Sequence, residues 1–85
     1  MLKNKKKYRF GIVSSDIILN PDVSMQAKGL YSVLACYANK QRSCFPSIST
    51  LSNDLNVSER TIKRLINELK TKNLIQRVGR NIVIK

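Results

Sequence analysis

Two short apolar stripes separated by a few polar residues constrain the fold of this chain more than any other feature. Both lie in residues 47–72, and both recur at the spacing of one face of an α-helix. Between them, Asn56 suits the left-handed conformation that ends a helix, and Ser58 suits the N-cap of the next one. So short a turn forces the two predicted helices to cross at a steep angle. The stripes consist of Ile48, Leu51 and Leu55 in the first helix and of Ile62, Leu65, Ile66 and Leu69 in the second.

The second predicted helix, residues 59–72, carries cations on the side opposite its apolar stripe. Arg60 and Arg64 are like charges at i and i+4, a spacing that destabilises an isolated helix unless an anion meets it. Arginine and asparagine, the latter supplied by Asn67, bind guanine and adenine edges bidentately in the major groove. A solvated basic face is the alternative interpretation. The helix and turn that precede this face favour a helix-turn-helix whose second helix reads DNA.

The charge of the whole chain also favours a polyanionic partner. The formal net charge is +11, from 16 Lys and Arg against 5 Asp and Glu, with no His. Residues 1–9 carry five cations and no acid, residues 10–56 balance, and residues 57–85 carry a surplus of six cations. Positive charge therefore gathers in an N-terminal arm and in the C-terminal half, which is typical of proteins that bind nucleic acid. We expect double-stranded DNA as the partner and no cofactor.

Several classes of function are disfavoured by what the chain contains. Two cysteines, Cys36 and Cys44, and no histidine are too few ligands for a structural zinc site, so we expect reduced thiols in the core or at its boundary, in a cytoplasmic protein. No apolar run reaches the roughly 18–20 residues that cross a bilayer. Enzyme activity is not expected, because the sequence has no histidine, no paired carboxylates and no glycine-rich phosphate loop.

The segments before the two helices are predicted in less detail. Residues 1–9 form a basic flexible arm, and two roles for it remain open: contact with a minor groove or phosphates, and a solubilising tail. Residues 8–19 suit an extended piece followed by one helical turn that begins at Ser14 or Ser15 and ends before Pro21. We expect this segment to cover the core from one side.

A further helix is predicted from an N-cap at Ser24 to about Asn39. Gly29 lies inside it at a cost of about 1 kcal/mol relative to alanine. We therefore expect Gly29 to pack closely against a neighbouring element, with a direct approach to phosphate as the alternative.

After Asn73 the pattern changes to β-branched and aliphatic residues on either side of 78–81, which predicts a short β-hairpin. A brief extended piece near Phe45 would supply a third strand. The predicted fold is therefore mostly α with a small β-hairpin, a winged helix-turn-helix. It has a three-helix core plus a C-terminal wing, in one domain of residues 10–85.

These residues resemble a known family. The runs Cys44–Ser47, Val57–Arg64 and Asn73–Ile75, with Leu51 and Leu55, are similar to winged helix-turn-helix domains of plasmid and phage replication initiators, and to DnaD-type primosome domains. The likeness extends over roughly residues 10–85. The spacing is fairly specific for winged helices, whereas many bacterial regulators share its Ser-x-x-Thr-hydrophobic-x-Arg core.

The resemblance implies roles for individual residues. In such domains the serine and threonine contact phosphates, which gives Ser58 and Thr61 a positioning role, and the exposed arginines and asparagine meet bases or phosphates. Ser58 serves an N-cap equally well, and Thr61 equally supports the turn. Lysines and the arginines of the wing would bind phosphates. The expected DNA-binding set is Ser58, Arg60, Thr61, Lys63, Arg64, Asn67, Lys70, Arg77 and Arg80.

The resemblance favours replication initiation in a plasmid or phage, with replication or regulatory proteins as further partners. A small transcriptional regulator and a protein-interaction module stay open as alternatives, and so does an anionic membrane surface bound through residues 3–9. Initiators of this kind usually continue into further domains, so two expectations stay open. The chain is either the N-terminal module of a longer protein or a compact phage or plasmid protein complete in itself. With no long amphipathic helix left over to build a dimer, we expect a monomer.

Overall fold

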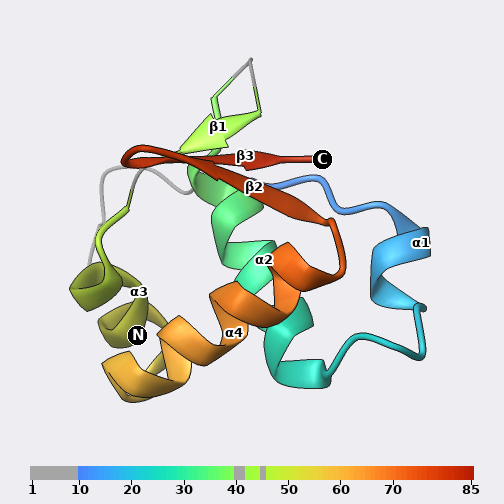
Figure 1. Ribbon diagram of the computed structural model, residues 1–85. Coiled ribbons are helices and arrows are strands. Elements are labelled where there is room, and N and C mark those ends of the chain that lie inside the picture. The colour runs from blue at the N-terminus through green and yellow to red at the C-terminus, as the bar shows by residue number, and fades with distance from the viewer. Residues whose placement is uncertain (1–9, 40–41, 45) are drawn as a thin grey trace.

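The computed structural model describes residues 10–39, 42–44 and 46–85, so the predicted arm of residues 1–9 and Phe45 lie outside the described residues. The described part holds four helices and one antiparallel sheet with strand order β1-β3-β2 (Figure 1). The helices are α1 (Ser15–Ile18), α2 (Met25–Tyr37), α3 (Ile48–Leu55) and α4 (Glu59–Thr71), and the strands are β1 (Ser43–Cys44), β2 (Ile75–Val78) and β3 (Asn81–Ile84).

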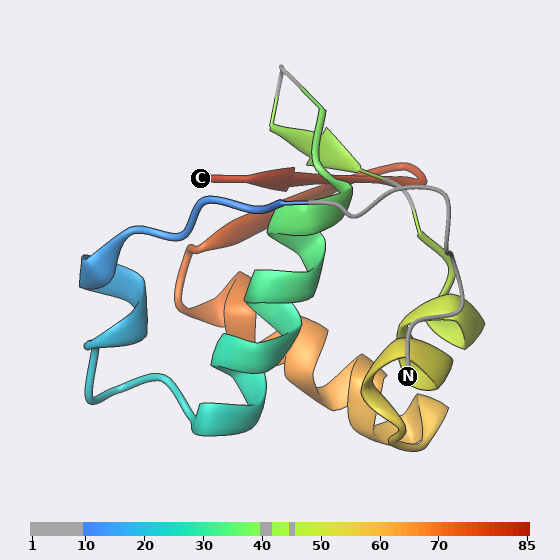
Figure 2. The ribbon, with the colours of Figure 1, turned by 180° about the vertical axis from the view of Figure 1, so that it is seen from behind.

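Helices α2, α3 and α4 pack against one another, and the sheet lies across one end of this group (Figures 1 and 2). Among the described residues the core is entirely apolar. Helices α2, α3 and α4 and the sheet all contribute buried side chains to it, because each turns one apolar face inward. The predicted stripe of α4 is fully confirmed, whereas only Leu51 of the α3 stripe is completely buried. The largest fully buried side chains are Leu30, Tyr31, Leu34, Leu51, Ile62, Leu65, Leu69, Ile75 and Ile82.

Serine side chains start the three core helices, as predicted for Ser24 and Ser58. Ser24, Ser47 and Ser58 have extended backbones, and each hydroxyl accepts a hydrogen bond from the amide three residues on, at 3.0–3.1 Å. Asn56 ends α3 in the left-handed conformation, with φ 56° and ψ 46°. The short turn between α3 and α4 is therefore built by the two residues that the sequence indicated, Asn56 and Ser58.

The C-terminal hairpin and the third strand are confirmed. Val78 pairs with Asn81 across a two-residue turn, in which Gly79 has a φ of 60° that glycine adopts without strain. Ser43 and Cys44 pair with β3, and the Ile84 amide donates to the Arg42 carbonyl at 2.8 Å. Cys44 is a buried free thiol whose pKa is raised by burial, and Cys36 is a half-buried free thiol. The fold is a winged helix-turn-helix, with a three-helix core and a C-terminal wing.

The N-terminal segment differs in part from its prediction. Ser14 caps α1, and Val13 and Ile17 pack against the core, as expected. However, Phe10 and Ile12 are 89% and 80% exposed, so they do not cover the core. Phe10 and Ile12 lie in the irregular segment before α1, where no helix or strand turns their side chains toward the core.

Helix α2 ends at Tyr37, two residues before the predicted end. Ala38 is already extended, and the Asn39 amide donates to the Ser43 carbonyl at 3.0 Å. The Asn39 side-chain oxygen also accepts from the Ser43 amide at 3.2 Å. These local bonds compete with a further helical turn, as asparagine side chains often do.

The expectation that Gly29 packs closely against a neighbouring element is wrong. A Cβ atom at this position would meet no atom within 4 Å, so neither close packing nor any contact of a neighbouring element explains the glycine. The tight glycine is Gly11, where a Cβ would lie 2.8 Å from the Cys36 amide nitrogen and 2.9 Å from the Ala35 carbonyl carbon. The chain before α1 therefore crosses the end of α2 at a distance that only glycine permits.

Candidate nucleic-acid interface

Helix α4 divides cleanly into a buried face and an exposed face. Its four buried side chains, Ile62, Leu65, Ile66 and Leu69, hold it against α2, α3 and β2. The opposite side is formed by exposed polar residues, and we call this group the outer face of α4. The outer face consists of Arg60, Lys63, Arg64, Asn67, Lys70 and Thr71. The structure thus brings together on one surface the five members of the predicted site that lie within this helix face.

Ser58 and Thr61 are engaged in the start of α4. The Ser58 hydroxyl accepts from the Thr61 amide at 3.1 Å, and the two hydroxyl oxygens are hydrogen-bonded at 2.9 Å. Ser58 is exposed and Thr61 is half-buried. Their structural role as an N-cap pair is therefore present in the fold, at the end of the helix where backbone amides point outward and favour an anion.

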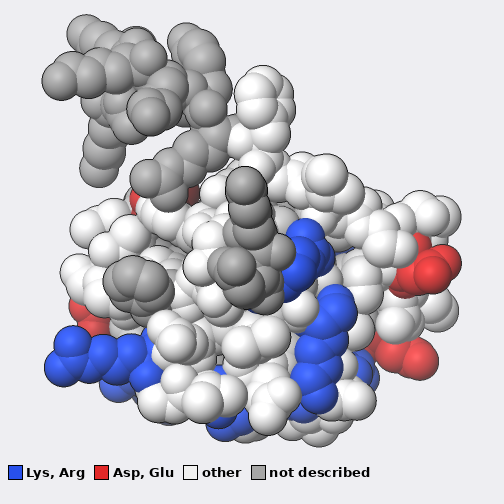
Figure 3. All heavy atoms as spheres, turned by 90° about the horizontal axis from the view of Figure 1, so that it is seen from above, with Lys and Arg blue, Asp and Glu red and all other residues white. Residues whose placement is uncertain are grey.

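The two arginines of the wing lie apart from the outer face of α4. Arg77 pairs with Ile82 in the hairpin and Arg80 follows Gly79 in its turn, and both side chains are exposed. Figures 1 and 2 show the hairpin tip at the sheet end of the molecule, well separated from α4. Figure 3 looks down on the sheet and shows Lys and Arg side chains on this face, with Asp and Glu side chains toward its edges.

Two residues at the start of α2 reach across to α4, and no sequence pattern identified either contact. The Arg64 guanidinium donates to the side-chain oxygen of Gln26 at 3.1 Å. Glu68 accepts from both the backbone amide and the hydroxyl of Ser24, each at 2.9 Å. These bonds, chiefly the one from the Ser24 amide, lower the pKa of Glu68 against the opposing effect of desolvation, and Lys72 and Arg64 lower it further.

The sequence contained only part of the signal for this cluster. The capping preference of serine identified Ser24 as the start of α2, but no pattern paired Ser24 with Glu68. Nothing in the chain marked Gln26, because its contact with Arg64 spans 38 residues and depends on how two helices cross.

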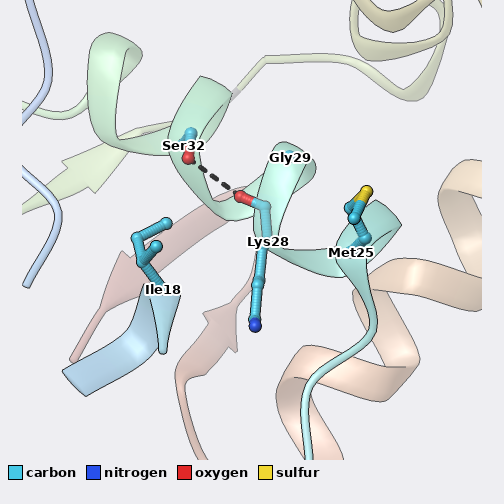
Figure 4. A pocket seen from close by; sticks show the side chains of 5 residues that line it. All are labelled: Ile18, Met25, Lys28, Gly29 and Ser32. Atoms are coloured by element: carbon cyan, nitrogen blue, oxygen red, sulfur yellow. Dashed lines mark hydrogen bonds between the residues drawn. The ribbon is translucent and has the colours of Figure 1, made fainter. Parts of the chain in front are cut away.

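An open pocket lies on another surface, between α1 and α2 (Figure 4). The Ser32 hydroxyl in its wall donates to the Lys28 carbonyl of the preceding helical turn at 2.9 Å, a local bond that occupies its donor. The lining is Ile18, Met25, Lys28, Gly29 and Ser32.

Within the described ranges, no group of three or more histidine, cysteine or acidic residues is placed to hold a metal ion. Among those same residues, no helix has the length and apolar character needed to span a membrane.

Comparison with known proteins agrees with the observed fold. A family model described as a helix-turn-helix domain matches residues 23–75, from just before α2 to the first residue of β2. Neither the curated proteins nor the solved structures compared include a significant match. The matched region covers more than half of the chain and contains the three core helices, the turn between α3 and α4, and the whole outer face of α4. The chain therefore belongs to the helix-turn-helix domain family.

Proposed function

We propose that this domain binds double-stranded DNA by placing the outer face of α4 in the major groove. The observation that carries the proposal is the composition of that face, which presents arginine, lysine, asparagine and threonine on a helix anchored by four buried side chains. A major groove admits one α-helix, and these side chain types bind base edges and phosphates.

The residues have different roles in this proposal. Arg60, Arg64 and Asn67 lie where α4 faces away from the core, so they contact base edges. Lys63 and Lys70 lie toward one side of that face and bind phosphates, as do Ser58 and Thr61 at the first turn of α4. Arg77 and Arg80 of the wing bind the flanking backbone. Backbone contacts set the affinity and its salt dependence, and base contacts set the preferred sequence.

We propose replication initiation in a plasmid or phage as the cellular role, with other replication proteins as partners. The support is the resemblance of residues 57–64 and 73–75 to initiator domains. Transcriptional regulation uses the same groove-reading helix and is the alternative. A protein-interaction module based on α4 is disfavoured, because the large exposed apolar side chains of the described residues all lie outside this helix. The proposed role is binding, in the cytoplasm and by a monomer, without catalysis.

The test is to map the surface that DNA touches. Addition of a short duplex to isotope-labelled protein should shift backbone amide resonances of residues 58–71 and of the hairpin tip. Lys63→Ala should weaken binding to every duplex, whereas the matched variant Lys28→Ala, which removes the same charge from the pocket beside α1, should bind as the wild type does. Shifts confined to the surface around Lys28 would contradict the proposal.

A further inference from the structure

The bond between Gln26 and Arg64 joins the proposed DNA-reading surface to a different helix. Arg64 lies on the outer face of α4, and Gln26 lies in the first turn of α2, with both side chains exposed. Their heavy atoms are 3.1 Å apart. A guanidinium group has only donors, so the side-chain oxygen of Gln26 is the atom that faces it.

The position of Gln26 is itself fixed by a second pair of bonds. Ser24, two residues earlier, donates from its amide and its hydroxyl to the two oxygens of Glu68, each at 2.9 Å. The same Ser24 hydroxyl accepts from the Ala27 amide and so caps α2. Glu68 lies one helical turn after Arg64. The first turn of α2 is thus tied to α4 directly beside the arginine that Gln26 holds.

Arg60 provides an internal comparison on the same helix face. It lies one turn before Arg64 and is equally exposed, but no hydrogen bond or ion pair joins its side chain to any of the residues that the structure describes. An unrestrained arginine loses considerable rotamer freedom when it binds a base, whereas an arginine already held in one arrangement loses less. The two arginines therefore differ in preorganisation while sharing chemistry and helix face.

We propose that Gln26 is a positioning residue that orients Arg64 for recognition of one base pair, an inference that rests on the proposed DNA-binding function of α4. Gln26 acts through Arg64 and makes the preference for that base pair depend on both side chains. Arg60 reads its own base pair, or a phosphate, independently of Gln26. Sequence specificity in this domain then depends on the contact between α2 and α4 as well as on α4 alone.

The experiment is selection from random duplex DNA, with sequencing of the bound fraction, for the wild type and the variants Gln26→Ala, Arg64→Ala, Arg60→Ala and Gln26→Ala/Arg64→Ala. Gln26→Ala should reduce the preference at the base pair affected by Arg64→Ala by about three- to tenfold, the size expected for the net contribution of one exposed hydrogen bond. The double variant should lose no more preference at that position than Arg64→Ala does. The base pair affected by Arg60→Ala should keep its preference when Gln26 is replaced.

Gln26→Glu separates orientation from charge. It retains an acceptor oxygen for Arg64, so the preferred sequence should stay as in the wild type, while the added negative charge weakens binding to every duplex. The thermal midpoint of Gln26→Ala should match that of the wild type, because Gln26 is exposed.

Each alternative outcome has its own meaning. If Gln26→Ala changes the preference at a different base pair, Gln26 reads DNA itself. If Gln26→Ala leaves the preference unchanged, or lowers affinity for all duplexes equally, Gln26 has no positioning role. Each of these results overturns the inference. If Arg64→Ala also leaves the preference unchanged, the proposed role of the outer face is wrong as well. An effect of Arg64→Ala without an effect of Gln26→Ala removes the inference alone.

Discussion

The outer face of α4 and the tip of the wing both expose arginines, but they are built differently. Four buried side chains hold α4 in place, and a hydrogen bond from Arg64 to Gln26 restrains one of its cations. Strand β2 has one buried residue, Ile75, and no side-chain hydrogen bond joins Arg77 or Arg80 to the rest of the described chain. We therefore expect the outer face of α4 to select the sequence and the hairpin tip, whose residues 76–81 are all exposed, to add affinity.

The largest predicted effect comes from removing an anchor of α4. Leu65 is 1% exposed on the buried face of the helix, opposite the outer face. Leu65→Ala should lower the free energy of unfolding by about 2–5 kcal/mol, from lost burial and the cavity left behind. Chemical denaturation followed by circular dichroism measures this. Leu19→Ala, at a 74% exposed position, is the control and should change stability by less than about 0.5 kcal/mol. Equal losses in both variants would show that Leu65 does not anchor α4.

Replacing Arg64 should affect sequence preference while leaving the fold intact. Arg64→Ala should cost about 1–3 kcal/mol of discrimination at one base pair, the range expected for a bidentate contact between arginine and guanine. The measurement is the ratio of dissociation constants for the preferred duplex and for a duplex changed at that base pair. A ratio that stays at the wild-type value in Arg64→Ala would remove the distinction between α4 and the wing.

The tie between α2 and α4 should be sensitive to acid. The pKa of Glu68 is lowered in the folded protein, mainly by the bond from the Ser24 amide, so its contribution to stability is present above the unfolded pKa and is lost as pH falls through the folded pKa. As pH falls from above the usual glutamate pKa through the lowered pKa of Glu68, Glu68→Gln should therefore lose less stability than the wild type does. Denaturant midpoints across this range provide the measurement, and identical pH profiles for the two proteins would contradict the role given to Glu68.

The smallest predicted effect belongs to the wing. Arg80→Ala should weaken binding to all duplexes similarly and reduce the slope of log K against log salt by about one, because one phosphate contact is lost. The preferred sequence should stay unchanged. Titrations of two duplexes at several salt concentrations test this. A change in base preference would show that the wing reads sequence, and the contrast with α4 would then fail.

Local chemistry made much of this fold predictable. Ser24, Ser47 and Ser58 cap their helices, Asn56 adopts the left-handed conformation, and Gly79 opens the hairpin turn, because each feature depends on a few neighbouring residues. The outer face of α4 was predictable for the same reason, since helical periodicity determines which side chains share a side.

Contacts between distant segments were not predictable. The bond from Gln26 to Arg64 depends on how α2 crosses α4, and a single glutamine in a helix carries no signal of its own. Gly29 was expected to pack closely but faces open space. Gly11 is the glycine that lies too close to the end of α2 to carry a side chain. Composition and spacing identify the glycine, but only the arrangement of neighbouring segments reveals which one lacks room for a side chain.

The central claim is that the outer face of α4 recognises particular base pairs, and selection by the wild-type protein at low and at physiological salt tests it most directly. We predict an enriched sequence motif that persists at the higher salt, with total binding reduced as phosphate contacts weaken. Binding that retains no motif and collapses at the higher salt would contradict the claim, because the net charge of +11 would then account for the interaction without sequence recognition by α4.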